Sequence, residues 1–418
     1  MTEIRLGEIR SRHQMIRFFD GYAIERMEEL DERKLKRPLV KTQLLELLDG
    51  GQTHTPQGLQ SIFGRRGVRL EPLGEGLFLA TDAQIGEIGF LEPLRPRIVA
   101  LYSTIESTAL KRWVRYLVQR SPEIDYVWLS GLTFNVLWGL VVKLSRSHRF
   151  TRLVFTHDSI FDIDGRTPEA DEDEEEATQD SEDEDFGEIV ERRATSFRLV
   201  DRIGVIQEKL ERLQKVYTPL YAISQLRFPS SVGRGGHDFY DNGRVTNRSE
   251  SFRDHRSHLL FVVRIYEQLL KSTEEQAWYS IQESVDIPGQ FRKIVGAPVV
   301  IHFQEPLNRE VFDQWVTGTF SRKKNRFRLW GHPIRLGPTK VHVYGVDRHL
   351  WQPLFLELTA KGCTAIIPNG TCGNTVHRLV TNIQRYLDPG AEAFIGEKPY
   401  KQVVEESARG IPYDPGTE

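Results

Sequence analysis

Residues 321–387 read SRKKNRFRLWGHPIRLGPTKVHVYGVDRHLWQPLFLELTAKGCTAIIPNGTCGNTVHRLVTNIQRYL. After a basic and aromatic beginning, strand-like segments follow at 340–344, 354–358 and 364–367. Apolar and polar residues that alternate in this way predict strands with one buried face. The turn residues between the segments favour consecutive strands of an antiparallel sheet.

Helices are expected on either side of these strands. Over 375–387 apolar residues recur at helical spacing, 309–320 predicts a further helix, and 298–303 adds a strand. One helix, several strands and a closing helix describe an α+β layer, in which helices cover an antiparallel sheet. We therefore expect a C-terminal α+β domain at 296–390 and a loose tail at 391–418.

Region 96–166 predicts a different class of fold. Three expected strands alternate with two helices, which is the pattern of a parallel α/β unit. Ligands on such sheets bind beyond the C-terminal ends of the strands, a rule that singles out His157 and Asp158. No GxGxxG or Walker A loop follows these strands, so nucleotide binding of those kinds has no support.

The fold class expected for the whole chain is α/β plus α+β, divided into six regions. They are 1–95, an N-terminal helical and hairpin region; 96–166, the α/β domain; 167–188, an acidic disordered linker; 189–295, a helical region with a loop rich in Gly and Arg; 296–390, the C-terminal α+β domain; and 391–418, the tail. In the first region, helices expected at 18–36 and 39–48 precede a hairpin, which suggests a degenerate winged helix. A structural α+β cap is the alternative for that region.

Charge is unevenly distributed along the chain. The 418 residues carry a net charge of -3, but 169–188 holds 13 acidic residues and no Lys or Arg. The rest has 56 basic against 46 acidic residues, a net charge of +10. Basic folded surfaces favour polyanions. The leading hypothesis is therefore an intracellular multidomain protein that binds nucleic acid, in DNA transactions or defence; the acidic segment is a solvated linker or a competitor for that surface.

The candidates for nucleic-acid or anion binding come from three stretches. They are Arg234, His237, Arg244, Arg248, Arg322, Lys323, Lys324, Arg326, Arg328, Trp330, Asn369, Gly370, Gly373 and Asn374. On a strand, Arg326, Arg328 and Trp330 share one face, where arginines would meet phosphates and the indole would stack on a base. The alternative places Phe327 and Leu329 in the core and the arginines in water.

The turn NGTCGN, residues 369–374, suggests cysteine chemistry. It joins a strand to a helix, whose free amide groups can hold an anion or lower the pKa of the Cys372 thiol. His342 or His349 would then act as the base and Asp347 would orient it. Alternatively, the glycines serve turn geometry and Cys372 is a small buried residue.

A metal is the second route to an enzyme. His157 and Asp158 precede Asp162 and Asp164, and a second set contains His237, Asp238, His255 and His258. The enzyme hypothesis is thus a metal-dependent phosphodiesterase or nuclease, or a cysteine hydrolase. The pattern specifies neither the metal nor a cofactor. The catalytic candidates are His157, Asp158, Cys372, His342, His349 and Asp347.

Location and partners follow from composition. The two cysteines, Cys363 and Cys372, form no disulfide framework and fit a reducing, cytoplasmic compartment. The most apolar window, 126–142, is barely long enough to cross a bilayer and predicts a buried strand and helix, so no membrane association is expected. A third hypothesis is a non-catalytic assembly subunit with a protein partner or a homo-oligomeric state.

Overall fold

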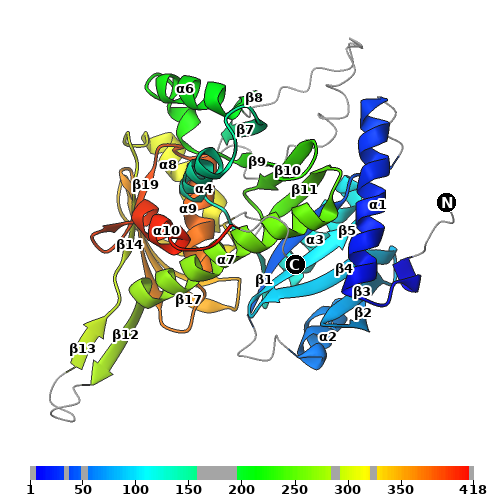
Figure 1. Ribbon diagram of the computed structural model, residues 1–418. Helices are drawn as coiled ribbons and strands as arrows, with labels where there is room; N and C mark the ends of the chain where they lie inside the picture. Colours follow the sequence, from blue (N-terminus) through cyan, green and yellow to red (C-terminus); the bar gives the residue numbers. More distant parts are fainter. Residues whose placement is uncertain are drawn as a thin grey trace, which may run out of the picture.

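The computed structural model describes residues 6–32, 37–48, 55–157, 195–283, 292–320 and 327–413, and Figure 1 shows them arranged around two sheets. The fold is a mixed α/β arrangement with antiparallel sheets. Among the described helices, none is long and apolar enough to cross a membrane.

The first sheet draws its strands from the N-terminal half and the middle of the chain. They are β1 (Lys41–Leu47), β2 (Val68–Gly74), β3 (Leu77–Asp82), β4 (Gly86–Arg95), β5 (Ile98–Ser103), β6 (Ile124–Tyr126), β7 (Phe150–His157), β8 (Thr195–Arg202), β9 (Gln225–Pro229), β10 (Gly235–Tyr240) and β11 (Arg244–Ser249). Their order is β2-β3-β4-β5-β1-β11-β10-β9-β7-β8, and β6 pairs with β1 beyond the end of β11. Neighbouring strands run antiparallel.

The second sheet is built from the C-terminal part. Its strands are β12 (Trp278–Glu283), β13 (Arg292–Val295), β14 (Val299–His302), β15 (Leu329–Gly337), β16 (Lys340–Asp347), β17 (Gln352–Thr359), β18 (Gly362–Pro368), β19 (Glu392–Ile395) and β20 (Lys398–Pro399). The main order is β15-β16-β17-β18-β14-β19-β20 and is antiparallel. A short parallel pairing of β12 with β18 connects the β12–β13 ribbon to it.

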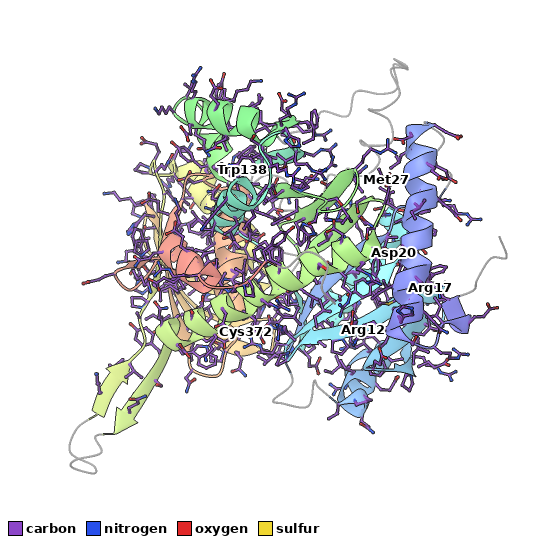
Figure 2. All side chains as sticks on the ribbon, viewed as in Figure 1. Arg12, Arg17, Asp20, Met27, Trp138 and Cys372 are labelled. Atoms are coloured by element: carbon purple, nitrogen blue, oxygen red, sulfur yellow. The ribbon has the colours of Figure 1, made fainter. Side chains whose placement is uncertain are left out.

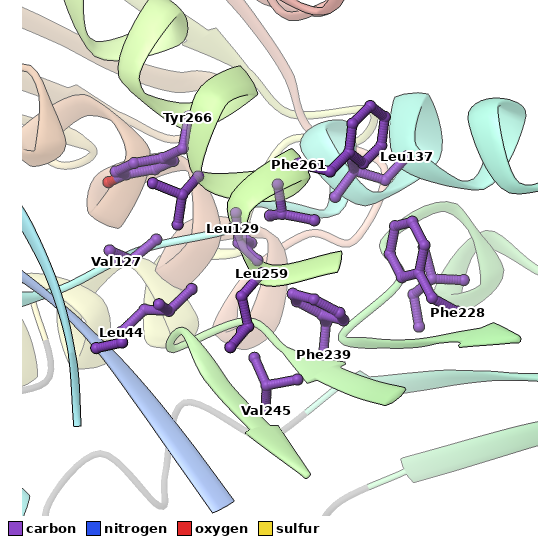
Figure 3. Packing of buried hydrophobic residues seen from close by; sticks show 14 of the residues in the cluster. Leu44, Val127, Leu129, Leu137, Phe228, Phe239, Val245, Leu259, Phe261 and Tyr266 are labelled. Atoms are coloured by element: carbon purple, nitrogen blue, oxygen red, sulfur yellow. The ribbon is translucent and has the colours of Figure 1, made fainter. Parts of the chain in front are cut away.

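Helices cover both sheets. They are α1 (Arg12–Asp31), α2 (Pro56–Gly64), α3 (Ser107–Arg120), α4 (Gly131–Leu144), α6 (Ile203–Gln214), α7 (Phe252–Ala277), α8 (Arg309–Phe320), α9 (Asn374–Tyr386) and α10 (Tyr400–Ala408), with 3-10 turns η1 (Leu6–Glu8) and η3 (Thr218–Tyr221). The 26-residue helix α7 runs past both sheets (Figure 1). Its Leu259 and Phe261 lie in the core of the first sheet (Figure 3), whereas Leu269 and Ala277 belong to that of the second.

The predicted parallel unit at 96–166 is wrong. Strands β5 and β7 lie in one sheet, but β5 pairs antiparallel with β1 and β4, and β7 with β8 and β9. A strand–helix–strand pattern predicts parallel neighbours only when no other segment inserts between them. Here β1 pairs with β5 and β6, and β11, β10 and β9 separate β1 from β7.

The helix predicted at 39–48 is also wrong, because this segment forms β1. All seven residues of β1 are buried, so its sequence lacks the alternation of a half-exposed strand. A uniformly buried strand and a buried helix have similar apolar runs. Without a second helix before the hairpin, the outline of a winged helix is lost.

Two segments expected to be irregular are ordered. The loop rich in Gly and Arg forms β9, β10 and β11, with the expected tight turn at Asn242-Gly243, where Gly243 has φ 73°. The expected tail adds β19 to the second sheet and packs α10 through Tyr400, Val403 and Val404. The antiparallel meander β15–β18 with α8 and α9 was predicted correctly.

Leu44→Ala tests the assignment of β1 as a central strand. The Leu44 side chain is fully buried in the first core, so its truncation should lower the free energy of unfolding by about 2–5 kcal/mol. Chemical denaturation measures this loss. Leu144→Ala, at a residue 46% exposed, is the control and should change stability by about 0.5 kcal/mol or less. Equal effects of the two substitutions would contradict the assignment.

Candidate functional site

A buried carboxylate occupies the centre of the first sheet. Glu46 of β1 is fully buried, and Arg97 donates to its Oε1 from Nε at 3.1 Å and also from Nη2. Arg97 also donates from Nη1 to Glu274 at 2.8 Å. Burial alone would raise the pKa of Glu46, but Arg97, followed by His349, lowers that pKa to about 2. Glu46 is therefore an ionised carboxylate inside the protein.

Cys372 meets this carboxylate from the turn before α9. Its Sγ donates to Glu46 Oε1 at 2.9 Å, and Arg97 Nη2 donates to Sγ at 3.0 Å. Burial and the charge of Glu46 raise the pKa of the Cys372 thiol well above its ordinary value. The predicted lowering of this pKa is wrong, because burial and the adjacent carboxylate both disfavour the thiolate. Figure 2 shows Cys372 where the two sheets meet.

The turn between β16 and β17 brings His349 to the same place. The Nδ1 atom lies 2.7 Å from the carbonyl oxygen of Pro122, which can only accept, so Nδ1 carries a proton. The Nε2 atom lies 3.7 Å from Glu46 Oε2, too far for a hydrogen bond, and has no hydrogen-bond partner in the described part of the chain. His349 is 1% exposed. A buried ring nitrogen thus faces a carboxylate without a hydrogen bond.

Glu46, His349 and Cys372 form what we call the junction cluster. One ligand atom from each residue lies within 4.8 Å of the other two, and all three residues are buried. Carboxylate, imidazole and thiolate are the ligand types of zinc. A histidine that binds zinc through Nε2 commonly donates its Nδ1–H to a backbone carbonyl, as His349 does to Pro122. The donor set therefore fits a divalent ion.

The turn that carries His349 is strained. Leu350 and Trp351 follow it with φ of 66° and 55°, in the left-handed region that side chains other than glycine rarely adopt. Asp347 Oδ1 accepts from the His349 backbone N–H at 2.9 Å and fixes the start of the turn. Strain of this kind persists only where surrounding contacts enforce it, and it clusters at functional sites.

A second ionic network also holds this turn in place. Arg378 of α9 donates to Asp347 Oδ2 at 2.5 Å and also to Asp125, which Arg328 contacts at 2.9 Å. Burial opposes ionisation of Asp125, but Arg328 and Arg378 hold its pKa below the ordinary range. Thr375 donates to Asp347 as well. The network joins α9, β6, β16 and the residue just before β15.

A pocket of about 440 Å³ adjoins the junction cluster. It is lined by Leu48, Arg97, Pro122, Glu123, Trp278, Leu350, Trp351, Gln352, Gly370 and Thr371. Arg97 lines this pocket and also contacts Glu46 and Cys372, while Pro122 and Leu350 flank His349 in space and in sequence. Residues that contact or adjoin the cluster thus line the pocket, although Glu46, His349 and Cys372 themselves do not.

The expected anion site at the start of α9 already contains a carboxylate of the protein. Gly373 N donates to Glu274 Oε1 at 2.9 Å. The Asn374 side chain donates to the Tyr126 carbonyl at 2.8 Å and accepts from Tyr266. Gly370 lines the pocket, and Asn369 N donates to the Tyr279 carbonyl. Gly373 and Asn374 are buried in the turn, whereas Asn369 and Gly370 are exposed.

Of the other proposed catalytic groups, the structure brings His349 close to Cys372, whereas Asp347 contacts the His349 backbone and not its ring. His342 lies on β16 and pairs with Glu357 at 2.6 Å. His157 ends β7 and belongs to neither cluster of candidate metal ligands, and Asp158 lies outside the described residues. Glu46, Arg97 and Glu274 were missed. A lone glutamate inside the apolar run 44–48 was the one signal that pointed to Glu46.

Of the arginines proposed to bind nucleic acid, those in the described part of the chain are engaged with the protein itself. Arg248 contacts Asp238 at 2.9 Å, and exposed Arg234 contacts Asp31 at 3.0 Å. Arg244 is buried, with its guanidinium 3.8 Å from the centre of the Tyr240 ring. Arg328 is also buried, and it contacts Asp125. Trp330 is 51% exposed on β15, and Arg322, Lys323, Lys324 and Arg326 lie outside the described residues.

The histidines of the second expected metal set do converge. His237 Nε2 lies 2.8 Å from Asp254 Oδ2, and His237 Nδ1 lies 3.3 Å from His255 Nδ1. His255 Nε2 contacts Thr42, and the two nitrogens of His258 contact the Asp254 carbonyl and Tyr413. Every ring nitrogen has a partner, so the histidines form a hydrogen-bonded network, within which His237, Asp254 and His258 also bring possible ligand atoms within 4.8 Å of one another. Asp238, expected in this set, instead binds Arg227 and Arg248.

Acid should unfold the protein partly through His258. Burial and the neighbouring His237 outweigh Asp254 and lower the pKa of His258 to about 4. The unfolded chain, with a histidine pKa near about 6.5, then binds this proton between about pH 6.5 and 4 while the folded protein does not. Stability should be complete above this window and fall by up to about 3 kcal/mol across it.

Denaturation at several pH values measures the slope, and His258→Gln should flatten it. The exposed residue His148 provides a control, because His148→Gln should leave the slope as it is in the wild type. An unchanged slope in His258→Gln would remove His258 from this account.

Arg378→Met tests the second network. It leaves Asp347 and part of Asp125 without their cation in a buried place, which should lower the free energy of unfolding by about 3–5 kcal/mol. Arg385→Met on the same helix removes a contact with Asp241 at a side chain that is 21% exposed, and should cost about 1 kcal/mol or less. Similar losses for the two variants would show that the network is not special.

The fold and its junction define a two-sheet α/β protein with a buried carboxylate–histidine–cysteine cluster. The family model of MJECL33-like proteins matches residues 4–402, so the chain belongs to the MJECL33-like protein family. It is similar to "Uncharacterized protein MJECL33" of Methanocaldococcus jannaschii, at 27% identity over 152 residues. The match covers 36% of this chain and 34% of that protein. No solved structure shows significant similarity.

Proposed function

We propose that the chain is a metal-dependent hydrolase whose ion is held by Glu46, His349 and Cys372. The observation that carries this proposal is the Nε2 atom of His349. Its position is set by the Nδ1 contact with Pro122, it lies within 4.8 Å of the ligand atoms of Glu46 and Cys372, and no described group donates to it. A divalent ion gives this lone pair a partner.

The charges of the junction support a dication. Glu46 contributes one negative charge, and the Cys372 thiol directs its proton at the same carboxylate. Binding of a divalent ion would displace this thiol proton to solvent, so that two anionic ligands balance two positive charges. Arg97 donates to both Glu46 and the Cys372 Sγ, and would keep these two ligands in position.

Three protein ligands are typical of catalytic rather than structural zinc. The remaining position of such an ion takes water and lowers the pKa of that water towards neutrality. The chain contributes the pocket, where Trp351 and Leu350 would exclude solvent and Arg97 borders the cluster. A substrate with an apolar or aromatic portion suits these walls.

The other hypotheses derived from the sequence have less support. A cysteine hydrolase needs a thiolate, and the high pKa of the Cys372 thiol beside Glu46 argues against one. A basic docking surface loses support where its arginines are paired with carboxylates. We keep a cytoplasmic location as a proposal, because the buried Cys372 must stay reduced to bind an ion.

Cobalt binding tests the ion. The full chain, freed of metal by a chelator and titrated with Co²⁺, should bind one ion and show thiolate-to-cobalt charge-transfer absorption. Cys372→Ser should abolish this absorption, and His349→Gln should weaken binding by roughly 100-fold or more. Cys363→Ser, at the other buried cysteine, should retain both the absorption and the affinity. Absorption that survives in Cys372→Ser would overturn the site.

Turnover tests the reaction. The zinc-loaded protein is assayed with bis(p-nitrophenyl) phosphate and with p-nitrophenyl acetate, before and after treatment with chelator. Hydrolysis of at least one should require the ion and fall by at least about 100-fold in His349→Gln. An ion bound with no turnover of either compound would assign a structural role to the metal and refute the hydrolase.

A further inference from the structure

The outer face of β15–β18 is unusually apolar for an exposed surface. Trp330, Tyr344 and Phe355 are 51%, 68% and 38% exposed, and Ile366 on β18 is 37% exposed. The register places Tyr344 opposite Phe355, and Phe355 opposite Ile366. Exposed apolar residues gathered in this way mark a binding site. We call this surface the aromatic face.

The aromatic face is a consequence of strand alternation. Residues of the same strands with the other parity, among them Leu329, Val343 and Leu356, belong to the buried core. The core therefore needs only one side of each strand, and the large rings on the other side contribute nothing to it. The Tyr344 and Phe355 rings meet edge to face, with centroids 5.4 Å apart and planes at 89°.

Charge on these strands favours an anion. The residues from 329 to 368 contain four cations, Arg335, Lys340, Arg348 and Lys361, of which Arg335 is paired with Asp313 of α8, against two carboxylates, Asp347 and Glu357. Asp347 is buried with Arg378, and Glu357 is held by Lys340 at 2.9 Å and His342 at 2.6 Å. Neither carboxylate is left unmatched on the face.

We propose that the aromatic face binds single-stranded nucleic acid. Unpaired bases would stack on Trp330, Tyr344 and Phe355, because every base has a flat ring whatever its sequence. Phosphates would lie near Lys340 and His332, the latter opposite Tyr344 in the register. A duplex is excluded from this mode, since its bases are already stacked on each other. The face binds its ligand without a metal ion, so this proposal does not depend on the hydrolase.

Two strands of the aromatic face lead to the pocket beside the junction cluster. The β16–β17 turn carries Trp351 into the lining of the pocket, and the same two strands present Tyr344 and Phe355. A strand that lies along the face therefore reaches the pocket beside the junction cluster.

Fluorescence anisotropy of a labelled 20-nucleotide strand measures the binding, with DNA and RNA of the same mixed sequence as separate probes. Metal-free full-length protein should bind at least one of them, with an affinity that falls as salt rises. Tyr344→Ala and Trp330→Ala should each weaken binding by roughly fivefold or more. Both side chains are exposed, and thermal unfolding verifies that the variants fold.

Tyr116→Ala is the matched control, because Tyr116 is 53% exposed on α3, outside the aromatic face. It should bind like the wild type, and an unlabelled duplex should compete at least roughly tenfold more weakly than an unlabelled single strand. Failure of both probes to bind, equal competition by the duplex, or wild-type affinity in Tyr344→Ala would each overturn the proposal. A dimer that Tyr344→Ala disrupts, without binding of either probe, would assign the face to a second copy instead.

Discussion

A single buried negative charge organises the junction of this protein. Glu46 lies on a strand that is buried along its whole length, so water cannot solvate its carboxylate. An ion in such a place must be compensated by groups of the protein. Arg97 and Cys372 supply that compensation from two distant parts of the chain. The contact of the two sheets therefore depends on electrostatics as much as on apolar packing.

This constraint explains why the surrounding arginines point inward. Arg97 carries its charge between Glu46 and Glu274, and Arg378 is divided between Asp125 and Asp347. Buried pairs of this kind add little net stability, because desolvation offsets the attraction, but loss of one partner is costly. They fix which groups can approach one another. The β16–β17 turn is held in an unfavourable backbone conformation as a result, and His349 is fixed with it.

Local signals in the sequence predicted local structure well. The helix expected at 309–320 is α8 with those bounds, and the helix expected at 375–387 is α9 at 374–386. Only part of the candidate site could be predicted from such local signals. Cys372 and His349, which carry recognisable chemistry, lie close together, whereas Asp347 contacts the backbone N–H of His349 and not its ring. Glu46 was hidden, because a fully buried strand has no period that separates it from a helix.

Long-range pairing accounts for the other failures. The Glu46–Cys372 contact joins residues 326 positions apart, and no spacing within either segment encodes it. Composition also could not predict which way the cationic side chains point. The net charge of +10 outside the acidic tract gives the excess of cations but not whether they face water. Arg227 and Arg248 both end on Asp238, and Arg256 on Glu92, all as internal pairs. Surface chemistry therefore has to be derived from residues that the core leaves unused. On the second sheet those residues are aromatic. Side chains alternate between the two faces of a strand, so when one face packs into the core the other face carries its rings to the surface.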